Sequence, residues 1–155
     1  MSFTIADRVR DLHPILRARA EPQAVVIIVS DDPSAGDTID MICDFFGLAV
    51  ELVPTDFDLW PFLQEFRPMA VIAHADGSGQ DGFHVMRTVA EYDCAIPVML
   101  LCGGDPVLAG AAEAVQEVCG LNTLLAVPEL PAIGSLVDFL FRAGRKAGLG
   151  RMMPV

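Results

Sequence analysis

Basic residues are scarce in this sequence. The 155-residue chain has 10 lysine and arginine residues against 21 aspartate and glutamate residues, so its formal net charge is −11. Binding to nucleic acid needs clustered lysine and arginine to neutralise phosphates, and an anionic membrane surface attracts the same side chains. The charge balance therefore argues against both kinds of partner, and the partner surface that it favours is a basic one.

Long apolar runs and paired cysteine motifs are missing too. No apolar run reaches the roughly 20 residues that a bilayer-spanning helix needs. The first ten residues, MSFTIADRVR, lack the apolar stretch of a secretory signal. The four cysteines, Cys43, Cys94, Cys102 and Cys119, show neither CxxC spacing nor the Cys/His pairing of zinc sites. We therefore expect a cytoplasmic protein whose thiols are reduced and mostly buried.

Short apolar runs alternate with amphipathic segments along most of the chain. The apolar runs predict five strands, at 24–30, 48–53, 69–74, 96–102 and 122–127. The segments between and after them predict five helices, at 34–46, 56–66, 82–91, 106–119 and 131–141. Continuous apolar strands that alternate with helices are typical of a parallel sheet buried on both faces. The sequence thus predicts an α/β fold, a doubly wound five-stranded parallel sheet.

Two terminal segments lie outside this alternation. Residues 1–23 predict an N-terminal helical extension, with a helix at 4–20 that carries its apolar residues close to one stripe and a short linker after it. Pro14 would kink or split that helix. Residues 24–144 form the predicted domain, and the basic, glycine-containing residues 145–155 predict a flexible tail.

The residues that follow each strand are the candidates for a functional site. In doubly wound sheets, ligands bind outside the carboxyl ends of the strands, where the strand order reverses. The segments at these ends are Ser30-Asp31-Asp32, His74-Ala75-Asp76, Cys102-Gly103-Gly104 and Val127-Pro128.

Several of these segments resemble the response-regulator receiver family, the chemotaxis-type phosphoacceptor domain. The likeness covers about residues 24–144. Its markers, in chain order, are the acidic pair in VSDDPS, the Asp81-Gly82 pair that would open the third helix, the strand IPVMLLC and the segment CGLNTLLAVPEL. Each marker is weak by itself, but their order and spacing match the family. The resemblance implies the receiver fold, with strand order 2-1-3-4-5.

A working receiver, by this resemblance, needs four kinds of group around one site. Two acids after the first strand bind a divalent cation, and an aspartate at the end of the third strand accepts the phosphoryl group. A serine or threonine after the fourth strand senses it, and a lysine before the proline after the fifth strand pairs with its charge. Such transfer depends on positioning and charge neutralisation.

Three of these positions carry other residues in this chain. His74 occupies the phosphoacceptor position, Cys102 the serine/threonine position and Val127 the lysine position. Valine cannot neutralise a phosphoryl group, a thiol is a poor donor, and histidine cannot form an acyl phosphate. The resemblance therefore implies a degenerate pseudo-receiver in bacterial-type signalling and phosphorelay-related processes, one that is not an enzyme.

The remaining acids leave two metal-based alternatives open. Asp31 and Asp32 match the family's acidic pair and, with Asp76, could form a weak Mg²⁺ site; no other cofactor is expected. With such a metal, His74 could accept a phosphoryl group on nitrogen. Otherwise His74 is an ordinary hydrogen-bonded histidine, and the two acids cap a helix.

A more distant alternative is a cobalamin-type cofactor domain. His74 and Gly77 fit the H-x-x-G pattern of such domains, and Gly103-Gly104 supplies a later glycine pair. However, Ile72 stands where that pattern has an aspartate, and the histidine follows the third strand instead of the first.

The remaining prediction concerns partners. In the receiver family, the surface formed by the fourth helix, fifth strand and fifth helix commonly contacts other proteins or a second copy. Residues 106–142 correspond to this surface, and few of them are charged. We therefore predict a protein-interaction or dimerisation module.

Overall fold

Strands and helices alternate throughout the part of the chain that the computed structural model describes, residues 24–75, 81–103, 105–127 and 133–146. The strands are β1 (Val25–Val29), β2 (Ala49–Val53), β3 (Ala70–His74), β4 (Val98–Leu101) and β5 (Leu124–Val127). The helices are α3 (Pro33–Phe45), α4 (Trp60–Phe66), α5 (Gly82–Asp93), α6 (Pro106–Cys119) and α7 (Ile133–Lys146).

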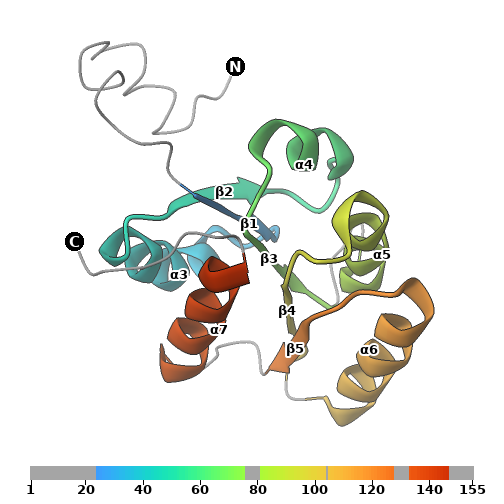
Figure 1. Ribbon diagram of the computed structural model, residues 1–155. Coiled ribbons are helices and arrows are strands. Elements are labelled where there is room, and N and C mark those ends of the chain that lie inside the picture. The colour runs from blue at the N-terminus through green and yellow to red at the C-terminus, as the bar shows by residue number, and fades with distance from the viewer. Residues whose placement is uncertain (1–23, 76–80, 104, 128–132, 147–155) are drawn as a thin grey trace.

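The five strands form one parallel sheet in the order β2-β1-β3-β4-β5. Figure 1 shows helices on both faces of this sheet, with α3 and α7 on one face and α4, α5 and α6 on the other. This arrangement confirms the predicted doubly wound fold and its strand order. All five predicted strands are present, and their bounds differ from the predicted ones by no more than two residues at either end.

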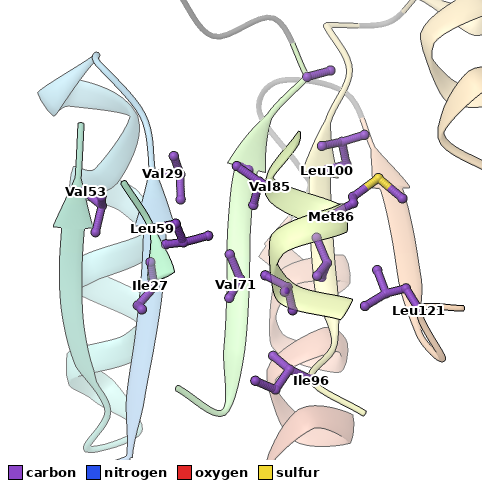
Figure 2. Close-up of a cluster of buried hydrophobic side chains, with 14 of the residues drawn as sticks. Ile27, Val29, Val53, Leu59, Val71, Val85, Met86, Ile96, Leu100 and Leu121 are labelled. Atoms are coloured by element: carbon purple, nitrogen blue, oxygen red, sulfur yellow. The ribbon is translucent and has the colours of Figure 1, made fainter. Parts of the chain in front are cut away.

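Each face of the sheet has its own apolar core, because alternate residues of a strand point to opposite faces. On one face, Ile27, Val71 and Leu100 pack with Val85 and Met86 of α5, as Figure 2 shows. On the other face, side chains of the same three strands pack with α3 and α7; they are Val26, Ile28, Ala70, Ile72, Met99 and Leu101. The central strands are therefore buried on both sides, which explains their uninterrupted apolar sequence.

Two helices differ from their predicted bounds by more than two residues at one end. The helix predicted at 56–66 begins only at Trp60, because Pro61 is suited to the first turn of a helix and not to its interior. The last helix continues to Lys146, beyond its predicted end near Phe141, so the first two residues of the predicted tail are helical. The helix predicted at 4–20 lies outside the described residues.

Candidate functional site

The carboxyl ends of β1, β3, β4 and β5 lie next to one another. Val29 pairs with Ala73, so the next step of the same register sets Ser30 beside His74. His74 pairs with Leu101, and Leu101 pairs with Val127. We call the line Ser30, His74, Leu101 and Val127 the carboxyl-end row. It crosses the sheet at the place where ligands bind in doubly wound folds.

His74 is the last residue of β3 and the centre of this row. Its side chain is half-buried, and its Nε2 atom is shielded from solvent. By strand alternation, His74 lies on the same sheet face as Ala70 and Ile72, which is the face that α3 and α7 cover. His74 thus lies at the end of the third strand, which is where the resemblance places the phosphoacceptor.

The beginning of α5 lies against His74. Asp81 caps this helix, because its carboxylate accepts a hydrogen bond of 2.9 Å from the backbone N–H of His84. A Cβ atom added to Gly82 would lie 2.8 Å from the backbone oxygen of His74, 2.9 Å from Cα of Ala75 and 2.3 Å from Cδ1 of Leu100. Only glycine allows this close approach, which explains the Asp81-Gly82 pair physically.

The predicted acidic pair, Asp31 and Asp32, is not part of the carboxyl-end row. Asp31 and Asp32 are both exposed and follow Ser30, the residue beside His74. Both carboxylate oxygens of Asp31 accept hydrogen bonds from Thr55, one from its backbone N–H at 2.9 Å and one from its hydroxyl. Asp31 therefore ties the end of β1 to the segment after β2.

The third predicted metal ligand, Asp76, lies outside the described residues. Across the part of the chain that the structure describes, no group of three or more histidine, cysteine, aspartate or glutamate side chains is arranged to hold a metal ion. The Mg²⁺ site formed by Asp31, Asp32 and Asp76 stays a prediction.

The sequence placed Ser30 at the end of the first strand but gave it no role. Its side chain is 3% exposed, and its hydroxyl accepts a hydrogen bond of 3.1 Å from the backbone N–H of Asp32. The receiver resemblance assigned a role to the next two residues, Asp31 and Asp32, and none to Ser30. Counting the alternation of strand residues from Val26 would have placed Ser30 on the same sheet face as His74.

Cys102 and Val127 lie at the carboxyl ends of β4 and β5, on the side of the site away from β1. The backbone N–H of Cys102 donates to the carbonyl oxygen of Val127 at 2.7 Å, so the two predicted positions are adjacent. Cys102 is buried, and its thiol lies 3.7 Å from the carbonyl oxygen of Leu100. Val127 is half-buried and brings no charge. The only lysine of the whole sequence is Lys146, at the end of α7, so the position before Pro128 has no lysine.

One thiol outside the site has a strongly perturbed acidity. Burial of Cys43 in α3, together with the nearby charge of Asp40, raises the pKa of this thiol to about 12. Cys43 therefore remains a protonated, unreactive core thiol at neutral pH.

No protein-family model matches the chain, and no curated protein matches it in sequence. Solved structures do match it. A response regulator receiver domain from Clostridium thermocellum gives a TM-score of 0.66 at 17% identity, over 81% of this chain and 98% of that one. Chemotaxis response regulator CheY4 of Vibrio cholerae gives 0.61 at 18% identity, over 79% of this chain and 99% of the other.

A third similar structure carries a metal. It is the receiver domain of a sensor histidine kinase from Pseudomonas aeruginosa, with a magnesium ion coordinated in its active site cleft. Its TM-score is 0.60 at 19% identity, over 82% of this chain and 99% of that chain. At such low identity these likenesses show a shared fold. The described part of the chain has the receiver fold, as the sequence predicted.

Two further findings bear on the sequence predictions. Among the helices within the described ranges, none is long and apolar enough to cross a membrane. For the cobalamin-type alternative, His74 lies at the end of the third strand as the sequence indicated, while Gly77 and Gly104 fall outside the described residues.

Proposed function

We propose that this chain is a pseudo-receiver, a cytoplasmic protein-interaction module of a bacterial-type signalling or phosphorelay system that is neither phosphorylated on aspartate nor an enzyme. The observation that carries the proposal is the carboxyl-end row. The end of β3 offers His74 in place of an aspartate, and its neighbours on either side are the neutral Ser30 and Leu101.

The chemistry of this row opposes aspartyl phosphorylation in two ways. Without a carboxylate at the end of β3, no acyl phosphate can form there. A phosphoryl group would also meet Cys102 and Val127, where a hydroxyl donor and an ammonium group would otherwise stabilise its negative charge. Asp31 adds negative charge at the end of β1 and already accepts two hydrogen bonds from Thr55. These features support a role that does not depend on phosphotransfer.

The interaction role is supported by apolar side chains on the surface formed by residues 106–142. On α6, Val107 is 76% exposed and Val118 is 89% exposed. Val118 also borders an open groove of about 520 Å³ between α5 and α6. Exposed apolar groups of this kind favour contact with another protein or with a second copy. Sedimentation of the full chain over a range of concentrations tests the second copy, which a monomer at every concentration would exclude.

Phosphoryl transfer to the intact protein tests the central claim. The full chain is incubated with Mg²⁺ and acetyl phosphate, and its intact mass is measured at neutral pH, because acid would destroy phosphohistidine. We expect no gain of the roughly 80 Da that one phosphoryl group adds, and no rise in melting temperature with Mg²⁺. A phosphorylatable receiver domain treated in parallel shows that the reagents work.

The alternative role of His74 as a metal-assisted acceptor is an outcome of the same experiment. The variants His74→Ala and His84→Ala form a matched pair, because His84 is an exposed histidine on α5. A mass gain that disappears in His74→Ala and persists in His84→Ala would show that His74 accepts the phosphoryl group. That result would overturn the phosphorylation-independent role.

A further inference from the structure

Charge is unevenly distributed along the chain. Residues 24–144 contain three basic residues, Arg67, Arg87 and Arg142, against eighteen acidic ones. The 23 residues that precede this domain contain four arginines against three acids, and the last eleven residues contain three basic groups and no acid. A strongly acidic domain thus carries a terminal segment on each side whose net charge is positive. Opposite charges on one chain favour contact between the parts that carry them.

The outer face of α3 combines acidic and apolar side chains. Met41 is 65% exposed and Phe45 is 53% exposed, one helical turn apart. Asp37, Asp40 and Asp44 are exposed beside them on the neighbouring stripe of the helix. We call these five residues the α3 strip. Two large apolar groups next to three carboxylates form a surface that fits a basic, amphipathic helix.

The carboxyl end of α3 strengthens this preference. The aligned peptide dipoles of a helix place partial negative charge at its carboxyl end, which favours nearby cations. The last turn of α3 has no basic residue and contains Asp44 instead. The negative charge of the helix end and that of Asp44 therefore add together, and arginine side chains close to this end would stabilise both.

The chain enters the domain next to that helix end. The backbone N–H of Ala49 donates to Ala24 at 2.9 Å, and that of Leu48 donates to Cys43 in the last turn of α3 at 2.8 Å. Ala24 follows residues 1–23 directly. The arginines nearest to this junction in sequence are Arg17 and Arg19.

We propose that residues 4–20 of this chain dock in cis on the α3 strip. The sequence places Ile5, Val9, Leu12 and Leu16 close to one stripe of a helix, which matches the apolar part of the strip, and Arg17 and Arg19 match its carboxylates. The 13 residues of α3 span about 20 Å, and a helix over 4–20 would span about 25 Å, so the lengths agree. A linker of three residues gives an effective concentration on the order of millimolar, at which even a weak contact forms.

This docking is independent of the pseudo-receiver role and assigns a function to the outer face of α3, whose inner face packs against α7. A cis segment on α3 would keep Met41 and Phe45 away from other proteins. It would also cover one helix of the domain without occupying the carboxyl-end row.

Limited trypsin digestion of the full chain tests the proposal, because trypsin cleaves after the four arginines of residues 1–23. Docking predicts slower cleavage there than in a synthetic peptide of residues 1–23. The variants Met41→Ser/Phe45→Ser and Asp40→Asn/Asp44→Asn should each speed this cleavage about tenfold, because cleavage follows the population of the undocked segment. Raising the salt concentration should speed it as well, since exposed charge pairs are screened.

Matched controls separate docking from general loosening of the fold. Glu113→Gln/Glu117→Gln removes two exposed acids from α6 and should leave cleavage unchanged. Cleavage after Arg151, in the last residues of the chain, should be the same in all variants, and their melting temperatures should stay within a few degrees of the wild type.

Three results would overturn the proposal. The first is cleavage of residues 1–23 in the wild type at the rate of the free peptide. The second is protection that the α3 variants do not reduce. The third is protection that disappears on dilution, which would assign the segment to a second copy of the chain.

Discussion

His74 has two contrasting sides. On one side the start of α5 lies so close that Gly82 leaves no room for a Cβ atom beside the backbone of His74. On the other side lie the positions where the receiver resemblance places a serine or threonine and a lysine, and they are occupied by Cys102 and Val127. The first side is defined by how closely α5 packs, and the second by which polar or charged groups are present. The comparison teaches that the packing around a strand end and the chemical groups placed there are separate features of a fold.

The largest expected effect comes from a substitution on the packed side of His74. We expect Gly82→Ala to lower the free energy of unfolding by about 3 kcal/mol, because the new methyl group would meet backbone atoms of His74 and Ala75 that cannot move aside. Gly110→Ala is the matched control, since a Cβ atom there meets nothing within 4 Å. Alanine in a helix should stabilise the protein by up to about 1 kcal/mol. Urea denaturation of both variants measures the difference, and similar values for the two would contradict the close approach.

An intermediate effect concerns the hydrogen bond between Thr55 and Asp31, at the end of β1. Thr55 is buried, and its hydroxyl donates to the carboxylate of Asp31. We expect Thr55→Val to cost about 1–2 kcal/mol of unfolding free energy, because a hydrogen bond to a charged group is lost.

The control for this change is Thr88→Val, whose hydroxyl donates to the carbonyl oxygen of His84 in its own helix. That variant should change the unfolding free energy by less than about 0.5 kcal/mol. If Thr55→Val were equally silent, the hydrogen bond from the Thr55 hydroxyl to Asp31 would not stabilise the fold.

The smallest expected effect comes from removing the side chain of Asp81, which caps α5 beside His74. Asp81→Ala should cost about 1 kcal/mol, because the carboxylate no longer accepts from the backbone N–H of His84. Asp105 caps α6 in the same way, through the N–H of Val107 at 2.9 Å, and Asp105→Ala should cost a similar amount. Thermal unfolding of both variants tests this. A much larger loss for Asp81→Ala alone would mean that the cap also supports the loop next to His74.

Local patterns in the sequence were sufficient for most of the fold. Uninterrupted apolar strands such as VVIIV identified a sheet buried on both faces, because only a parallel sheet between two helical layers buries such strands completely. Pro61 indicates where α4 begins, because proline fits the first turn of a helix. The predicted start at residue 56 was too early because Phe57 and Leu59 extended the apolar pattern before Pro61.

The candidate site was only partly predictable. The sequence placed His74 at the end of the third strand, where the structure has it, and the structure adds that Cys102 donates to Val127 through its backbone. The acids after β1 were harder to place, because register decides which side chain faces which neighbour. A shift of one residue exchanges the two faces of a strand, and here it sets the neutral Ser30 beside His74 and leaves Asp31 with Thr55.

The sequence by itself determined which chemical groups this protein has, including a histidine at the end of the third apolar run and a valine at the end of the fifth. It also determined the alternation of strands and helices, because apolar periodicity is a local property. Only the tertiary structure decided that Gly82 must be glycine, that Ser30 stands beside His74, and that Met41 and Phe45 remain on the surface of α3. Those features depend on segments far apart in sequence, whose separations are fixed only when the sheet and its two helical layers pack together.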